Sequence, residues 1–308
     1  MDNGRVKRKI SGMDVLEALK DILLIVTLCC FAIAVIAAVK SEVDKKRNRN
    51  ETDELRRRVA AVQVQDSVPD NVKLVTVPVT GDGDDPAAAD EEEEIIPDPE
   101  ILDEYKELYS ENPDLAGWIR IEDTRIDYPV MQTFGENEWY YLDKSFSKTR
   151  NSNGSLFADP SCVIGTGSVK YDYRDGTRPG TNIIIYGHRM NNGDMFGGLG
   201  KYLKKDYGMA HNIICFDSLY EHREYELIAV FRSKIFYKDE DVFKYYQFTT
   251  ASTKAEFDDS YESIKDQAVY DTGVEAQWGD EFITLSTCDH YTANGRLVVV
   301  AKRTDNKK

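Results

Sequence analysis

The longest apolar run in the chain lies near its N-terminus. Residues 22–39, ILLIVTLCCFAIAVIAAV, contain eighteen consecutive side chains without a charge. A helix needs about 20 apolar residues to cross a bilayer, so this run predicts a transmembrane anchor. A cleaved signal peptide is the alternative, although its apolar part is usually only about 7–15 residues long. Basic residues flank the run on both sides, so the positive-inside rule does not decide its orientation.

Polar segments separate this run from the rest of the chain. Residues 41–66 are rich in Glu, Arg, Lys and Val and predict a charged helical stalk, and residues 80–100, TGDGDDPAAADEEEEIIPDPE, predict an extended, disordered linker. The predicted organisation therefore has four parts. They are an N-terminal segment at 1–21, the anchor at 22–39, the stalk and acidic linker at 40–100, and a globular domain at 101–308.

The globular part consists mostly of short alternating or apolar runs separated by turn residues. A short amphipathic helix is predicted from about Ile101 to the Asn112-Pro113 pair. The runs that follow are RIDYPVM, GSLFAD, NIIIYGH, NIICFD, EYELIAVFRSKIF, EFITLSTC and RLVVVAKR. A helix is predicted at 253–267, between two of the last strands, because apolar residues recur there at helical spacing. Seven or eight strands in about 200 residues predict a mainly β domain, either a barrel or a sandwich.

Composition supports a folded domain whose acidity is local. Hydrophobic residues make up 41% of the chain and aromatic residues 11%, which is enough to fill a sizeable core. The net charge is −16, but residues 82–104 hold twelve acidic side chains and no basic one, so the rest of the chain carries about −4. No basic cluster occurs in the C-terminal two-thirds, so nucleic acid is not a predicted partner.

Five cysteines occur without a repeated spacing. This number and pattern indicate neither a disulfide framework nor a CxxC zinc site. Cys29 and Cys30 lie in the apolar run, and Cys162 and Cys215 have no suggestive His or turn signal beside them. We expect these last two to be small buried hydrophobes.

Cys288 differs because it ends the strand EFITLSTC. Ile283 and Leu285 fall on one face of that strand and Cys288 falls on the other. If the two aliphatic residues face the core, the thiol points outward at the end of the strand. A structural thiol is normally buried and inert, so this position favours a nucleophile.

His188 is the predicted base for that thiol. It ends the apolar run NIIIYGH and precedes a turn rich in Gly and Asn, and strand ends in all-β folds converge on one rim. An ordinary surface histidine is the alternative interpretation. His290 is the rival base, but it lies two residues from Cys288 and would need a tight turn to point back. His211 and His222 are interpreted as solvated loop or turn residues.

Arg296 is the third candidate. The connection DHYTANG, residues 289–295, joins the Cys288 strand to the apolar run RLVVVAK, so the two strands are expected to pair antiparallel. Cys288 then closes one strand and Arg296 opens the next, within reach across the ladder. A guanidinium beside a thiol can stabilise an oxyanion and hold a substrate backbone, whereas the alternative is an ordinary arginine at a strand end.

These motifs resemble a known family. TLSTC with Arg296 eight residues on, and IIIYGH about a hundred residues upstream, resemble the signature of sortases, the membrane-anchored cysteine transpeptidases of Gram-positive bacteria. NPDLAGWIRIEDTRIDYPVMQ, YYLDKSFS, GSLFAD and YGHRMNNGDMFGGLGKY resemble class B sortases in particular, and the likeness covers roughly residues 101–303. It implies a closed eight-stranded barrel with an N-terminal helix and a helix inserted between the penultimate strands, preceded by one transmembrane helix.

The resemblance also implies a site and a reaction. The catalytic residues would be Cys288, His188 and Arg296, with Ser286 as a candidate for substrate binding. The enzyme would cleave a C-terminal sorting signal through a thioacyl intermediate and join the protein to an amine of cell-wall peptide or of another protein, such as a pilin. The signal would be NPxTN-like or (S/N)PxTG-like rather than the LPxTG of class A, and the sequence does not choose between the two.

The resemblance further implies a single-pass protein of the cell membrane, with its N-terminus in the cytoplasm and its catalytic domain outside. No metal or organic cofactor is expected, because the required groups are all side chains. The stretch at 160–180 looks longer than its usual counterpart, so its effect on the rim near the site stays open. A non-catalytic, membrane-tethered binding domain on the same barrel is the alternative function. A papain-like hydrolase fits less well, because its cysteine would precede a helix.

Overall fold

The structure is a computed structural model that describes residues 12–66 and 96–304. The chain forms two compact units, which meet between Arg49 and Asn50 and are described separately. Residues 80–95 of the predicted acidic linker lie outside the described residues, as do residues 67–79 and both ends of the chain.

Helix α1 (Gly12–Asp66) makes up the described part of the first unit and continues into the second. All of the predicted anchor at 22–39 is helical, and its side chains are exposed. Its most apolar window of 18 residues has a mean hydropathy of 3.1. Among the described residues, α1 is the one helix long and apolar enough to cross a membrane.

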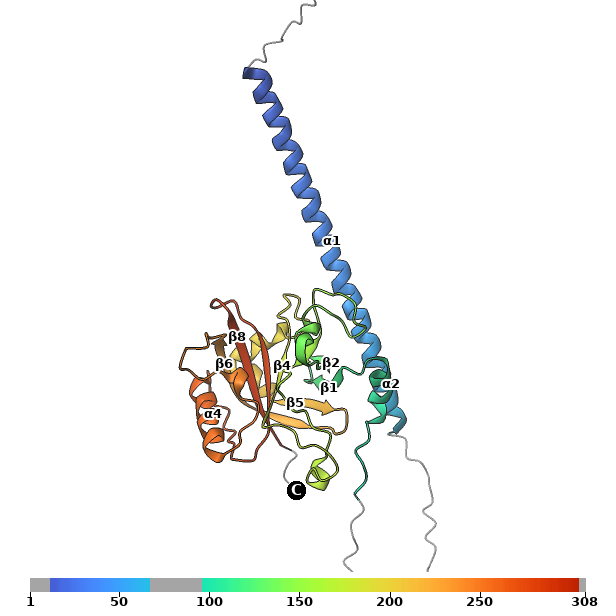
Figure 1. Ribbon diagram of the computed structural model, residues 1–308, viewed down its shortest axis with the longest axis vertical. Helices are drawn as coiled ribbons and strands as arrows, with labels where there is room; N and C mark the ends of the chain where they lie inside the picture. The colour runs from blue at the N-terminus through green and yellow to red at the C-terminus, as the bar shows by residue number, and fades with distance from the viewer. Residues whose placement is uncertain (1–11, 67–95, 305–308) are drawn as a thin grey trace, which may run out of the picture. The chain divides into compact units, whose positions relative to one another are not determined.

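The second unit is built on a closed barrel. Its strands are β1 (Leu115–Arg120), β2 (Asp127–Met131), β3 (Leu156–Ala158), β4 (Asn182–Tyr186), β5 (Ile213–Ser218), β6 (Glu224–Lys234), β7 (Phe282–Cys288) and β8 (Gly295–Arg303). Their order around the barrel is β1-β2-β3-β4-β7-β8-β6-β5, which confirms the predicted eight-stranded barrel over the sandwich. Figure 1 shows the strands wrapped around one interior.

Helices pack against this barrel, and η4 (Gly197–Leu203) adds Leu199 and Tyr202 to its interior cluster. The α-helices are α2 (Asp103–Glu111), α3 (Lys205–Ala210) and α4 (Lys254–Gln267), and the 3₁₀ helices are η1 (Gly135–Asn137), η2 (Tyr140–Leu142), η3 (Val169–Tyr171), η4 (Gly197–Leu203) and η5 (Tyr245–Gln247). Helix α2 and the α4 insertion between β6 and β7 are confirmed where the sequence predicted them. The α4 helix begins with an N-cap at Thr253, whose hydroxyl accepts the Glu256 backbone N–H.

The outer face of β7 lies under α4 and η5. Phe257 of α4 is fully buried and stacks on Phe282 of β7 with 5.5 Å between ring centroids. Thr284 and Ser286, which alternate with the interior residues of β7, are therefore buried as well. Because both faces of β7 are covered, the strand reaches solvent only where it ends, at Cys288.

The 160–180 stretch lies away from that end. The hydroxyl of Tyr173, in this stretch, donates to the Glu281 carboxylate at 2.7 Å and accepts from Arg303 at 3.0 Å. Glu281 precedes β7 and Arg303 ends β8, so these contacts are at the end of the barrel opposite Cys288. This part of the stretch therefore packs away from the rim near Cys288.

Candidate active site

Cys288 and Arg296 face each other across the hairpin that joins β7 to β8. The antiparallel register pairs Cys288 with Arg296, as the sequence predicted. The turn closes through the Asp289 N–H, which donates to the Gly295 carbonyl at 2.9 Å. A side chain on Gly295 would collide with that turn, because its Cβ would lie 2.3 Å from the Asp289 carbonyl oxygen. The thiol of Cys288 is exposed.

His188 reaches the same rim on the other side of β7. Strands β4 and β7 are parallel, and their register pairs Tyr186 with Ser286. Two hydrogen bonds continue it past the end of β4: the Gly187 N–H donates to the Ser286 carbonyl at 3.1 Å, and the Thr287 hydroxyl donates to the Gly187 carbonyl at 2.8 Å. These bonds bring His188 level with Cys288 at this end of the two strands.

A backbone carbonyl orients the His188 ring. Its Nε2 atom lies 2.8 Å from the carbonyl oxygen of Leu142, the last residue of η2. A carbonyl can only accept, so Nε2 carries the proton and Nδ1 is the acceptor of the neutral ring. His290, the rival base, has an exposed side chain in the 289–294 turn.

The Arg296 guanidinium is half-buried and held at one nitrogen. Its Nη1 donates to the carbonyl oxygens of Gly295 at 3.0 Å and Asn294 at 3.5 Å. Within residues 12–66 and 96–304, the structure gives Nε and Nη2 no acceptor. These N–H groups are therefore available to a bound ligand.

Ser286 does not open onto this rim. Its side chain is buried, and its hydroxyl shares a hydrogen bond of 2.8 Å with the Tyr245 hydroxyl of η5. Burial raises the pKa of Tyr245 to about 12, so the phenol stays neutral. The substrate-binding role of Ser286 stays a prediction. Tyr245 had no recognisable signal in the sequence, because a long connection separates it from β7.

An ion-pair cluster ties the loops beside the site together. The buried carboxylate of Asp289 accepts from Arg189 Nη1 at 2.7 Å and from Arg232 Nε at 2.8 Å. Burial alone would raise the pKa of Asp289, but the hydrogen bonds from the two arginines outweigh it and hold the pKa below its ordinary value. Arg189 follows His188 and Asp289 follows Cys288, so this pair connects the two loops.

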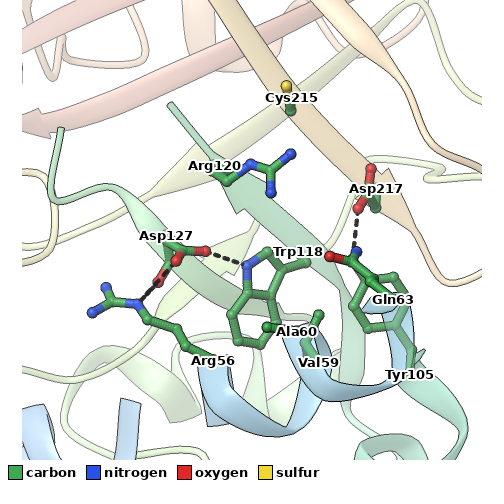
Figure 2. A pocket seen from close by; sticks show the side chains of 10 residues that line it. All are labelled: Arg56, Val59, Ala60, Gln63, Tyr105, Trp118, Arg120, Asp127, Cys215 and Asp217. Atoms are coloured by element: carbon green, nitrogen blue, oxygen red, sulfur yellow. Dashed lines mark hydrogen bonds and ion pairs between the residues drawn. The ribbon is translucent and has the colours of Figure 1, made fainter. Parts of the chain in front are cut away.

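The other cysteines of the barrel lie elsewhere. Cys162 is buried, and burial raises the pKa of its thiol to about 12, which confirms its interpretation as an inert residue. Cys215 is only half-buried and lines a cavity of about 70 Å³ between α1 and the barrel (Figure 2). Within the described residues, no group of three or more His, Cys, Asp and Glu side chains is placed to hold a metal ion.

Comparisons with known proteins agree with this architecture. The family model described as the sortase domain matches residues 119–304. Sortase B of Listeria monocytogenes is 34% identical over 206 residues, which is 66% of this chain and 75% of that protein. Sortase B of Bacillus anthracis in complex with AAEK2 has a TM-score of 0.55 and 32% identity, over 67% of this chain and 84% of that chain.

A Staphylococcus aureus sortase B–substrate complex shares the fold with a TM-score of 0.62, at 22% identity over 85% of this chain and 98% of that chain. The barrel order, the inserted α4 helix and the matched residues together define the class of protein. The chain belongs to the sortase family. Within that family it is a class B sortase, as the sequence resemblance implied.

Proposed function

We propose that this class B sortase is a cysteine transpeptidase that uses Cys288, His188 and Arg296. The observation that carries the proposal is the presence of these three residues at one end of the barrel. An exposed thiol ends β7, Arg296 lies directly opposite it on β8, and His188 is level with it beyond β4. Each of the three comes from a different segment, and each presents the chemical group that acyl transfer through a thiol requires.

The first half-reaction forms a thioester. The Cys288 thiol gives its proton to Nδ1 of His188, its sulfur attacks the carbonyl carbon of the Thr residue in a sorting signal, and the free N–H groups of Arg296 stabilise the resulting oxyanion. The C–N bond then breaks, and His188 gives a proton to the departing amine. The thioacyl enzyme and the released C-terminal peptide are the products of this step.

The second half-reaction transfers the acyl group. An acceptor amine attacks the thioester carbonyl, and His188 takes up the proton that the amine loses. The C–S bond then breaks, and the Cys288 sulfur leaves and takes that proton back from His188. The acceptor would be an amine of cell-wall peptide or of another protein such as a pilin. We expect a signal that is NPxTN-like or (S/N)PxTG-like, which agrees with the class but is not chosen by the geometry of the rim.

We further propose that α1 anchors the enzyme in the cell membrane as a single span. The apolar window of α1 supports this role by its length and its hydropathy. The orientation follows from the family resemblance, with the N-terminus in the cytoplasm and the barrel outside the cell, where sorting signals and cell-wall amines are found.

A trapping experiment tests the enzymatic proposal. The full-length chain in detergent is mixed with peptides carrying NPxTN-like, (S/N)PxTG-like and LPxTG-like signals, with and without a peptide amine. Mass spectrometry should find a thioester on Cys288 for one of the first two signals, and the amine should convert it into a transpeptidation product. If no peptide gives an adduct, the alternative of a non-catalytic binding domain is favoured.

A further inference from the structure

We propose that Glu51 of helix α1 is a positioning residue for His188, acting through the loop at 142–151. The inference rests on the proposed function, because it concerns the base of the same site. The path has two contacts. Glu51 holds the loop, and the loop presents the Leu142 carbonyl to the His188 ring.

The His188 ring depends on this loop for its orientation. Within the described residues, its one polar partner is the Leu142 carbonyl oxygen, 2.8 Å from Nε2. Among the residues that the structure describes, no carboxylate is hydrogen-bonded to the ring, so a shift of the loop moves the acceptor that sets both the tautomer and the direction of Nδ1. A displacement of 1 Å at a catalytic group can cost about 10²-fold in rate.

Glu51 binds this loop through hydrogen bonds a few residues after Leu142. Its Oε1 atom accepts the Ser147 backbone N–H at 2.8 Å and the Ser145 hydroxyl at 3.2 Å. From the opposite side, the Asn112 side-chain amide donates to the Phe146 carbonyl at 2.7 Å. The loop is therefore held between α1 and the end of α2.

The last turns of α1 are themselves fixed to the barrel, so Glu51 is a firm support. Leu55 and Val59 are only 4% and 6% exposed and pack in one cluster with Phe146 of the loop. The Arg56 Nε donates to the Asp127 carbonyl at 2.7 Å, and its guanidinium lies 4.9 Å from the centre of the Tyr128 ring. Figure 2 shows Arg56 reaching Asp127, which also accepts the Trp118 indole N–H.

Glu51→Ala tests the proposal in the full-length chain. Removing the carboxylate frees the Ser147 N–H and the Ser145 hydroxyl, and we expect kcat for peptide cleavage to fall about tenfold with KM unchanged. Glu51→Gln keeps an oxygen acceptor at the same place and should restore most of the rate. Glu54→Ala is the matched control, because Glu54 is exposed on the same helix and pairs with the exposed Arg57.

A second readout needs no sorting peptide. The rate of Cys288 alkylation by iodoacetamide, followed by peptide mass mapping, reports the ionised thiol, which a well-placed His188 favours. We expect the pH profile of Glu51→Ala to move to higher pH, while those of Glu51→Gln and Glu54→Ala match the wild type. Thermal unfolding of each variant should show that the barrel is intact.

The outcomes separate the two proposals. If Glu51→Ala remains folded and keeps both the wild-type kcat and the wild-type alkylation profile, the positioning role is wrong and the proposed function is untouched. If neither the wild type nor any variant cleaves any peptide but the alkylation profile of Glu51→Ala shifts, the positioning of His188 stands and the transpeptidase proposal fails. Equal losses in Glu51→Gln and Glu51→Ala would also overturn the role, because they would show that charge rather than the hydrogen-bond acceptor matters.

Discussion

Arg296→Lys separates the charge of this side chain from its geometry. A guanidinium carries five N–H donors in a planar fork, and in the structure Nη1 is occupied by the carbonyl oxygens of Gly295 and Asn294. The three N–H groups on Nε and Nη2 remain for a substrate carbonyl and the oxyanion. A lysine has a single ammonium, so an interaction with Gly295 leaves no second nitrogen to reach the reacting carbonyl.

The expected loss is that of one oxyanion donor. Removing such a donor typically lowers turnover by about 10²–10³, which corresponds to about 2.7–4 kcal/mol of transition-state stabilisation. We therefore expect kcat/KM of Arg296→Lys to fall by about 10²–10³, and that of Arg296→Ala to fall at least as far. Folding should be unchanged in both, because the side chain is half-buried at the rim and is not part of the core clusters.

The assay uses a quenched fluorescent peptide that carries the sorting signal found by thioester trapping. Initial rates over a range of peptide concentrations give kcat and KM separately, and mass spectrometry measures how much thioester accumulates on Cys288. Far-UV circular dichroism and thermal unfolding check the fold of each variant. If the turnover of Arg296→Lys lies within about threefold of the wild type, a diffuse positive charge is sufficient, and the oxyanion role of Arg296 must be withdrawn.

Three further predictions concern the thiol, the α4 insertion and a histidine on the far side of the barrel. Cys288→Ala should abolish peptide cleavage without loss of stability, because the thiol is exposed, whereas Cys162→Ala should stay active; cleavage by Cys288→Ala near the wild-type rate would contradict its role. Phe257→Ala should lower the free energy of unfolding by about 3–5 kcal/mol in denaturant titrations, because the ring is fully buried against β7, and a cost below about 1 kcal/mol would mean that α4 is loosely docked. The hydrogen bond to Asp217 raises the pKa of His222 above its ordinary value. Its stabilisation is therefore complete below the unfolded pKa of about 6.5 and disappears as the pH rises through the folded pKa, so His222→Gln should be destabilised at pH 5.5 and equal to the wild type at pH 9; equal costs at both pH values would exclude this linkage.

Several features were predictable from the sequence because neighbouring residues decide them. The apolar run at 22–39, the short alternating strands and the helical spacing around Phe257 are local patterns, and each element formed where its period predicted it. The pairing of Cys288 with Arg296 belongs to the same group. A short connection ending in Gly leaves two adjacent strands little freedom in register. The pairing of these two residues could therefore be predicted from their separation in the sequence.

Other features depend on contacts between distant segments, which no local pattern encodes. The parallel pairing of β4 with β7 joins residues about a hundred positions apart and places His188 level with Cys288. The oxygen that orients the His188 ring belongs to the backbone of Leu142. Any residue type has such an oxygen, so the sequence does not show that position 142 orients the histidine. Ser286 lies on the same face of β7 as Cys288, but the packing of η5 and α4 buries it.

In the segment of α1 from Asn50 to Asp66, the helix could be predicted from the sequence, but its docking on the barrel could not. Its composition predicted a charged helix, and it is helical. Charge alone did not reveal that Leu55 and Val59, four residues apart, share one face and pack in one apolar cluster with residues of α2 and of the loop at 142–151. Helix formation depends on interactions within a few residues, whereas docking depends on whether a complementary surface exists elsewhere in the fold, and that surface is assembled only when the barrel closes.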